Sequence, residues 1–160
     1  MQKITPFLWF DTQAEEAVNF YSSLFKDSKV GNASRYDEAG AAASGRPEGS
    51  VMTVSFQLNG QEFTAINGGP HFKFTEAISF VVNCENQEEV DYYWEKLSAV
   101  PQSEMCGWLK DKYGLSWQIV PTVLSKLLTD KDAKKSQRVM QAMLQMKKIE
   151  IADLEKAYKK

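Results

Sequence analysis

Two stretches of the chain decide its fold: PFLWFDTQAEEAVNFYSSLF at residues 6–25 and ISFVVNCENQEEVDYYWEKL at residues 78–97. Each begins with β-forming and aromatic residues, passes through a turn, and ends with apolar residues at three- and four-residue steps. These patterns predict a strand followed by an amphipathic helix, twice. Sliding the first helix onto the second pairs Glu15 with Glu88, a shift of 73 residues that holds along the helix. The repeat therefore predicts two copies of one module.

A hairpin is predicted after the helix in each half. Residues 51–58 and 61–67 are strand-like runs joined by Asn59-Gly60, a pair that adopts the positive φ angles of a two-residue turn. In the second half, residues 107–120 are expected to form the equivalent hairpin around a turn at 111–114. Each half is thus predicted to be β-α-β-β with one more short strand.

The remaining segments are predicted from composition and spacing. Residues 36–50 hold three glycines and one proline among alanines and serines, which favours a loop or a short strand end. After Pro121, apolar spacing predicts a helix over 133–148 and a short one carrying Ile151, Leu154 and Tyr158. We therefore expect one domain over 1–121, made of modules at about 3–70 and 74–121, and a helical C-terminal extension over 122–160.

Composition narrows the classes of function. The net charge is -2, from 19 basic and 21 acidic residues, so the composition predicts no strong positive potential that would bind nucleic acid. No apolar run approaches the length of a membrane span, and the N-terminus shows no export signal, so we expect a cytoplasmic protein that binds neither nucleic acid nor membrane. Cys84 and Cys106 lack CxxC spacing and are expected to be reduced thiols. We also expect the protein to bind no cofactor.

Three stretches resemble a known family: residues 6–25, LNGQEFTAINGGPHFKF at 58–74 and CGWLKDKYGLSWQIVP at 106–121. Together they look like the PhnB-like family of the vicinal-oxygen-chelate superfamily, which also holds glyoxalase I, extradiol dioxygenases and bleomycin-resistance proteins. This family often carries the name of a 3-demethylubiquinone-9 3-methyltransferase domain, although no Gly-rich turn here matches a nucleotide-binding fingerprint. The tail at 136–158 is similar to tails of the same branch.

The resemblance implies an α+β fold in which paired βαβββ modules curl into an incomplete barrel around a cleft. In metal-dependent relatives, His and Glu ligands come from the first and late strands of each module. Here those positions fall near residues 4–6, at Glu76 and at Gln118, and the only histidine, His71, lies in a loop. Because a divalent cation needs several converging donors, we expect no metal site.

Seven residues are candidates for lining the cleft. The aromatic residues could supply apolar walls, but core packing explains each of them as well. His71 could act as a general base or be a plain loop histidine, and Asn67 could shape a rim or end a strand. By strand alternation and the resemblance, Gln118 faces the cleft and Trp117 lies under a helix. The candidates are Trp9, Phe56, Asn67, His71, Glu76, Trp108 and Gln118.

Three functions stay open at this point. The first is a metal-independent protein whose cleft holds a small, partly apolar molecule, without an assigned activity. The second is a divalent-metal-dependent lyase or dioxygenase that uses Glu76, Gln118 and His71. The third is a structural or partner-binding homodimer, suggested by the amphipathic tail. The resemblance also implies a homodimer.

Overall fold

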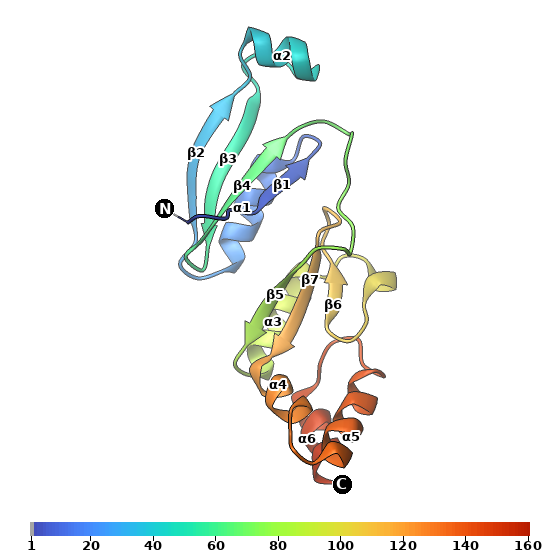
Figure 1. Cartoon of the computed structure of the whole chain (residues 1–160). Coiled ribbons are helices and arrows are strands. Elements are labelled where there is room, and N and C mark those ends of the chain that lie inside the picture. Colours follow the sequence, from blue (N-terminus) through green and yellow to red (C-terminus); the bar gives the residue numbers. More distant parts are fainter. Residues whose placement is uncertain (1) are drawn as a thin grey trace. The chain divides into compact units, whose positions relative to one another are not determined.

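The chain divides into two compact units, with the boundary in the sequence between Phe74 and Thr75 (Figure 1). This is seen in a computed structural model that describes residues 2–160. Each unit contains its own sheet: a four-stranded one of order β1-β4-β3-β2 and a three-stranded one of order β5-β7-β6. Together with the helices, these sheets confirm the predicted α+β class.

The first sheet contains the predicted hairpin. Strands β3 (Val51–Leu58) and β4 (Gln61–Asn67) pair antiparallel, and Asn59 and Gly60 have φ angles of 48° and 77° in the turn. Strand β1 (Phe7–Phe10) runs parallel to β4, and β2 (Lys29–Arg35) pairs antiparallel with β3. Strand β2 is the additional short strand expected in this half.

Helix α1 (Ala14–Leu24) packs on one face of this sheet. The buried residues of this helix recur at the three- and four-residue steps expected from the sequence. The sheet side chains beneath the helix include Leu8, Phe56 and Ala65, which are at most 6% exposed. The opposite face is more polar and more exposed. One face of the sheet is therefore core, and the other remains open in this unit.

The loop predicted for residues 36–50 is wrong in part, because Glu38–Ser44 form a helix, α2. Asp37 caps it by accepting a hydrogen bond from the Gly40 N–H at 2.7 Å, and Gly45 ends it in the left-handed conformation with a φ of 71°. The alanines between these caps are the strongest helix formers. The capping residues and alanines outweigh the glycines that suggested a loop.

The second unit repeats the strand-helix-hairpin order. Strand β5 (Ser79–Cys84) leads into α3 (Gln87–Leu97), and β6 (Trp108–Lys110) and β7 (Ser116–Pro121) form the expected hairpin. A short 3-10 helix, Pro101–Ser103, lies between α3 and β6. At the corresponding place, the first unit has the longer segment that contains β2 and α2. The additional strand expected in this half is reduced to a single bridge between Met105 and Trp108.

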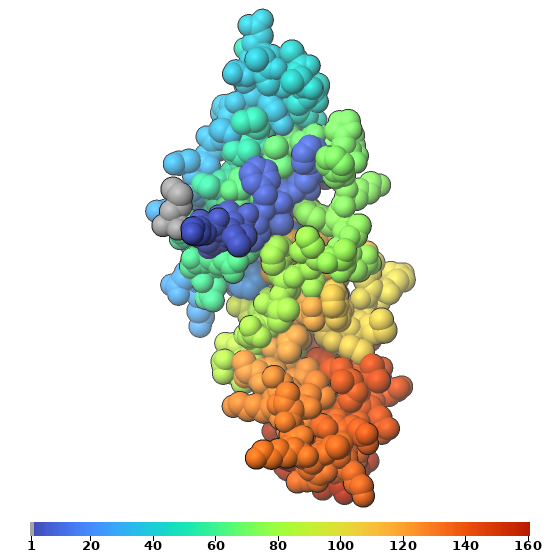
Figure 2. Space-filling view, in the orientation of Figure 1, coloured from blue at the N-terminus to red at the C-terminus, as the bar shows by residue number. Residues whose placement is uncertain are grey.

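Three helices follow the second hairpin: α4 (Thr122–Leu128), α5 (Ala133–Met143) and α6 (Ile151–Lys159). They enclose a small core of Leu124, Val139, Ile149 and Leu154. In the space-filling view, the orange and red atoms of this tail form one compact mass (Figure 2). Helix α4 was not predicted. No helix in residues 2–160 has the length and hydropathy to span a membrane.

The predicted helix over 133–148 is too long at its C-terminal end. Residues 146 and 147 lie against the β6 edge, where their carbonyls accept hydrogen bonds from the Cys106 and Gly107 N–H groups at 2.9 and 2.8 Å. A helix continuing to 148 would direct these carbonyls along its own axis instead. The contacts with the β6 edge therefore end α5 earlier than its periodicity suggests.

Candidate functional site

The second sheet separates its side chains cleanly between two faces. Trp117 and Ile119 of β7 are 3% and 0% exposed, on the face against which α3 packs. The alternate residues Ser116 and Gln118 lie on the other face, next to Lys110 and Trp108 across the strand pair. Trp117 thus lies under a helix, as predicted, and the face with Gln118 is open within this unit.

A cavity of about 460 Å³ lies on this open face, within the size range of small-molecule sites. We call it the second-sheet pocket. The side chains of Trp108 and Met105 supply apolar surface, and Met105 is 65% exposed. The polar lining comes from β6, β7, the 3-10 helix and the turn before β5, namely Glu76, Gln102, Ser103, Glu104, Lys110 and Ser116.

The Ser116 hydroxyl is the unusual polar group of the second-sheet pocket. The residue is 1% exposed, and its Oγ has no hydrogen-bond partner among residues 2–160. An unpaired buried hydroxyl costs about 1–3 kcal/mol, so native proteins rarely keep one without a reason. A ligand group in the pocket would satisfy it.

A charged pair lies beside this hydroxyl. The Lys110 ammonium contacts the Glu76 carboxylate at 2.5 Å, and the side chains are 23% and 61% exposed, respectively. The hydrogen bond from Lys110 lowers the pKa of the Glu76 carboxyl, and the positive charge of Lys110 adds to this effect. Glu76 therefore stays ionised at neutral pH and neutralises Lys110.

Two other polar groups nearby, those of Glu104 and Gln118, are already engaged. Glu104 accepts a hydrogen bond from Ser98 Oγ at 2.7 Å and pairs with Lys147 at 3.4 Å. Gln118 Nε2 donates to Ser79 Oγ at 2.9 Å on the same open face. Three sequence candidates thus share this face: Glu76 and Trp108 line the pocket, and Gln118 is paired with Trp108 across the strands.

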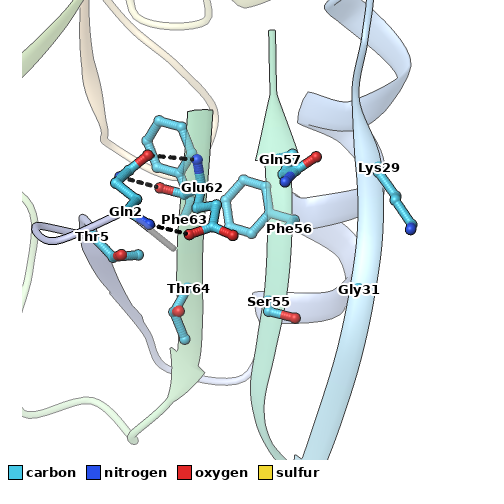
Figure 3. A pocket seen from close by; sticks show the side chains of 10 residues that line it. All are labelled: Gln2, Thr5, Lys29, Gly31, Ser55, Phe56, Gln57, Glu62, Phe63 and Thr64. Atoms are coloured by element: carbon cyan, nitrogen blue, oxygen red, sulfur yellow. Dashed lines mark hydrogen bonds between the residues drawn. The ribbon is translucent and has the colours of Figure 1, made fainter. Parts of the chain in front are cut away.

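A second cavity of about 390 Å³ lies on the open face of the first sheet (Figure 3). Three of the polar residues that line it, Gln2, Glu62 and Ser55, make hydrogen bonds within the first unit. Gln2 Oε1 accepts from the Glu62 N–H at 3.1 Å, its Nε2 donates to Glu62 O at 3.1 Å, and Ser55 Oγ bonds the Asn32 backbone. The candidate Phe56 is among its lining residues, but its ring is 2% exposed and stacks on Phe63.

The remaining candidates lie around the end of β4. Trp9 Nε1 donates to Gly69 O at 2.9 Å, and its ring covers Gly68 so closely that an added Cβ would lie 2.2 Å from it. His71 is exposed in the following loop. Glycine at 68 is therefore required by the close approach of the Trp9 ring.

Asn67 joins three parts of the first unit. Its Oδ1 accepts from the first amide of α1, Ala14 N–H, at 2.8 Å, and its Nδ2 donates to Val51 O at 3.1 Å. Its own carbonyl accepts from the Tyr36 hydroxyl at 2.9 Å. Gln13, at the N-cap position of α1, makes no side-chain cap, so Asn67 caps this helix from a neighbouring strand.

The donor groups do not fit a divalent cation. Within residues 2–160, no three side chains of His, Cys, Asp or Glu gather as a metal site requires. Glu76 is occupied by Lys110, and the Gln118 amide, itself bonded to Ser79, is a weaker ligand than a carboxylate.

The two cysteines are free thiols in different surroundings. Cys84 is fully buried at the end of β5, and burial, with smaller effects from Glu89 and Glu85, raises the pKa of its thiol from 9.0 to about 12. Below pH 9 this protonated thiol adds no pH dependence to the stability. Between pH 9 and 12 the unfolded chain loses the proton first, so stability is expected to fall across this window.

Iodoacetamide is therefore expected to distinguish the two thiols at pH 8. Cys106 is partly exposed and should be alkylated in the native protein, whereas Cys84 should react only after unfolding in urea, because the thiolate is the nucleophile. Intact-mass spectrometry would show one adduct without urea and two with it. A Cys106→Ser variant should show none without urea, and native alkylation of Cys84 would contradict its burial.

Two residues of the second-sheet pocket were missed in the sequence. Neither Ser116 nor Lys110 is among the candidates predicted from the sequence. Alternation along β6 and β7 places Lys110 with Trp108 and Ser116 with Gln118. This signal could have identified them, although the approach of Glu76 from 34 positions away in the chain could not be read from spacing.

Comparison with known proteins agrees with this architecture. Residues 2–120 match the family described as 3-demethylubiquinone-9 3-methyltransferase. The PhnB protein of Bacillus cereus is 45% identical over 76% of this chain and 100% of its own, with a TM-score of 0.62. Protein PA1353 of Pseudomonas aeruginosa is 15% identical over 76% and 98%, with a TM-score of 0.55, which shows a shared fold.

A glyoxylase/bleomycin resistance protein/dioxygenase domain from Frankia sp. EAN1pec is 15% identical over 76% of this chain and 92% of its own, with a TM-score of 0.44. No curated protein matched. The family match over 2–120 and the identity to PhnB confirm the resemblance stated from sequence. The chain belongs to the 3-demethylubiquinone-9 3-methyltransferase family, the PhnB-like family that its sequence resembles.

Proposed function

We propose that this chain is a binding protein that holds a small, partly apolar molecule in the second-sheet pocket without the help of a metal ion. The observation that carries the proposal is the unpaired, buried Ser116 hydroxyl at the wall of a cavity of about 460 Å³. Ligand pockets combine apolar walls with a few directed polar groups. Here Trp108 and Met105 are the apolar walls, and Ser116 and Lys110 are the polar groups.

The first-sheet cavity is a weaker candidate because, among the described residues, none that line it has a buried side-chain polar atom without a hydrogen-bond partner. Gln2 and Glu62 bond each other there through both backbone and side-chain atoms. A ligand in that cavity would have to break these hydrogen bonds, or form additional ones to groups that already have a partner and therefore gain little free energy. In the second-sheet pocket, a ligand would pair a group that is otherwise left without a hydrogen bond.

A thermal-shift screen of small metabolites, repeated in the presence of EDTA, tests the proposal. A compound at 100 times its Kd is expected to add about 2.7 kcal/mol to the free energy of unfolding, with or without the chelator. Trp108→Leu removes the aromatic wall, so hits should bind this variant at least about tenfold more weakly, a loss of about 1.4 kcal/mol.

Trp94→Leu is the matched control, since Trp94 lies on α3 and does not line the pocket. It should leave the response to each hit unchanged. Hits that stabilise Trp108→Leu as much as the unmodified protein would contradict the location of the site. Hits that require Mn, Fe, Ni or Zn, and vanish with EDTA, would instead support a metal-dependent lyase or dioxygenase.

A further inference from the structure

We infer that the second-sheet pocket selects small carboxylates with an apolar body, and that Glu76 occupies the carboxylate position as a built-in competitor. This inference rests on the proposed function and adds the chemical class of the ligand. It is drawn from the arrangement of Lys110, Ser116 and Glu76 at one end of the pocket and of Trp108 at the other.

Lys110 and Ser116 form a ready-made pair of donors. They are directly opposite each other in the β6–β7 register, which brings the Cβ atoms of such neighbours to about 4.5–5.5 Å. The ammonium provides charge and the hydroxyl provides a directed O–H with no other acceptor among the described residues. One carboxylate placed between them would accept from both, in charge-assisted hydrogen bonds.

Glu76 currently provides the carboxylate that Lys110 needs. It lies in the turn before β5, its side chain is 61% exposed, and its contact with Lys110 is the ion pair at 2.5 Å. An exposed ion pair of this kind contributes little to stability, so a ligand carboxylate can replace it at small cost. Lys110 itself is only 23% exposed and would remain in place.

The rest of the lining fits the remainder of such a molecule. Trp108 lies two residues from Lys110 on the same face, and Met105 adds a flexible apolar side chain beside it. Glu104 would repel an anion, but its carboxylate is bonded by Ser98 and Lys147. The body of an aromatic or aliphatic acid would therefore lie over Trp108, with its carboxylate toward Lys110 and Ser116.

Matched pairs of probes test the inference: benzoate with benzamide, phenylacetate with phenylacetamide, and hexanoate with hexanamide. Titrations would be followed by the NMR shifts of the Trp108 indole N–H and the amides of residues 108–116. The carboxylates are expected to bind more tightly than their neutral amides. Lys110→Met should weaken carboxylate binding at least about tenfold, and Ser116→Ala about fivefold, with little change for the amides.

Glu76→Gln is the decisive variant, because it should tighten carboxylate binding by up to about fivefold. Glu95→Gln and Lys96→Met, exposed on α3, are the charge-matched controls and should change nothing. Equal binding of acids and amides, or weaker carboxylate binding by Glu76→Gln, would overturn the anion selectivity and leave the proposed pocket intact. If neither series shifts any signal of residues 108–116, the proposed function itself fails.

Discussion

Replacing Asp111 by alanine is expected to lower the free energy of unfolding by about 3–5 kcal/mol. The residue is 1% exposed in the turn between β6 and β7. Its Oδ1 accepts from the Tyr113 and Leu115 N–H groups at 2.8 and 3.0 Å, and its Oδ2 accepts from Trp117 Nε1 at 2.9 Å. Alanine would leave three donors without their acceptor, two of them on residues that are nearly fully buried.

Urea unfolding followed by circular dichroism measures this loss. Asp111→Asn retains one acceptor oxygen and is expected to lose about half as much stability, since part of the network survives. Glu95→Ala, which removes an exposed carboxylate from α3, should change the stability by less than about 0.5 kcal/mol. A loss under about 1 kcal/mol for Asp111→Ala would show that the network contributes little.

Replacing Asn67 by alanine is expected to cost about 2–3 kcal/mol in the first unit. The change removes the acceptor for the Ala14 N–H at the start of α1 and the donor to Val51 O, in a residue that is 5% exposed. Both freed groups are backbone atoms that must then find water or remain unpaired. The same urea titration gives the loss.

Tyr36→Phe separates the side-chain and backbone roles of Asn67. It deletes only the hydroxyl that donates to the Asn67 carbonyl, and we expect a loss of about 1 kcal/mol. Asn19→Ala, exposed on α1, is the matched asparagine control. If Asn67→Ala were no more costly than this control, the side chain would not be what holds α1 to the sheet.

The periodic parts of the fold could be predicted from the sequence, and the parts set by caps and long-range contacts could not. Both helices of the repeat and both hairpins follow from apolar spacing and turn residues. The shift of 73 residues holds for the helices, but β1 ends at Phe10 and β5 at Cys84, a shift of 74. One residue is missing from the turn that follows β5, and a shift measured on the helices alone does not reveal it.

The missed elements have different physical causes. Helix α2 was overlooked because glycines were given more weight than the Asp37 cap and the alanines, although both signals are local. The early end of α5 depends on amides at Cys106 and Gly107, about 40 positions earlier in the chain. No periodicity records such a contact, because the sequence pattern describes only neighbours along the helix.

The candidate site divides in the same way. Trp108 and Gln118 follow from strand alternation, and Glu76 was considered as a metal donor. Its actual partner is Lys110, so the same carboxylate that suggested cation binding neutralises a cation of the protein itself. The sequence indicates that Glu76 takes part in an ionic interaction. It does not show that the partner is Lys110, because this contact forms only in the folded chain.

The attachment of residues 146–151 to the second sheet affects where this protein can be cut for recombinant expression. The match to the family model ends at residue 120, which would be a natural place to truncate. Yet Gln87, at the start of α3, bonds the backbone of Ile149 and Ile151, and Gly107 lies against the Ile149 side chain. A fragment ending at 120 would expose these groups to water, so the boundary of sequence similarity lies inside a single folded body.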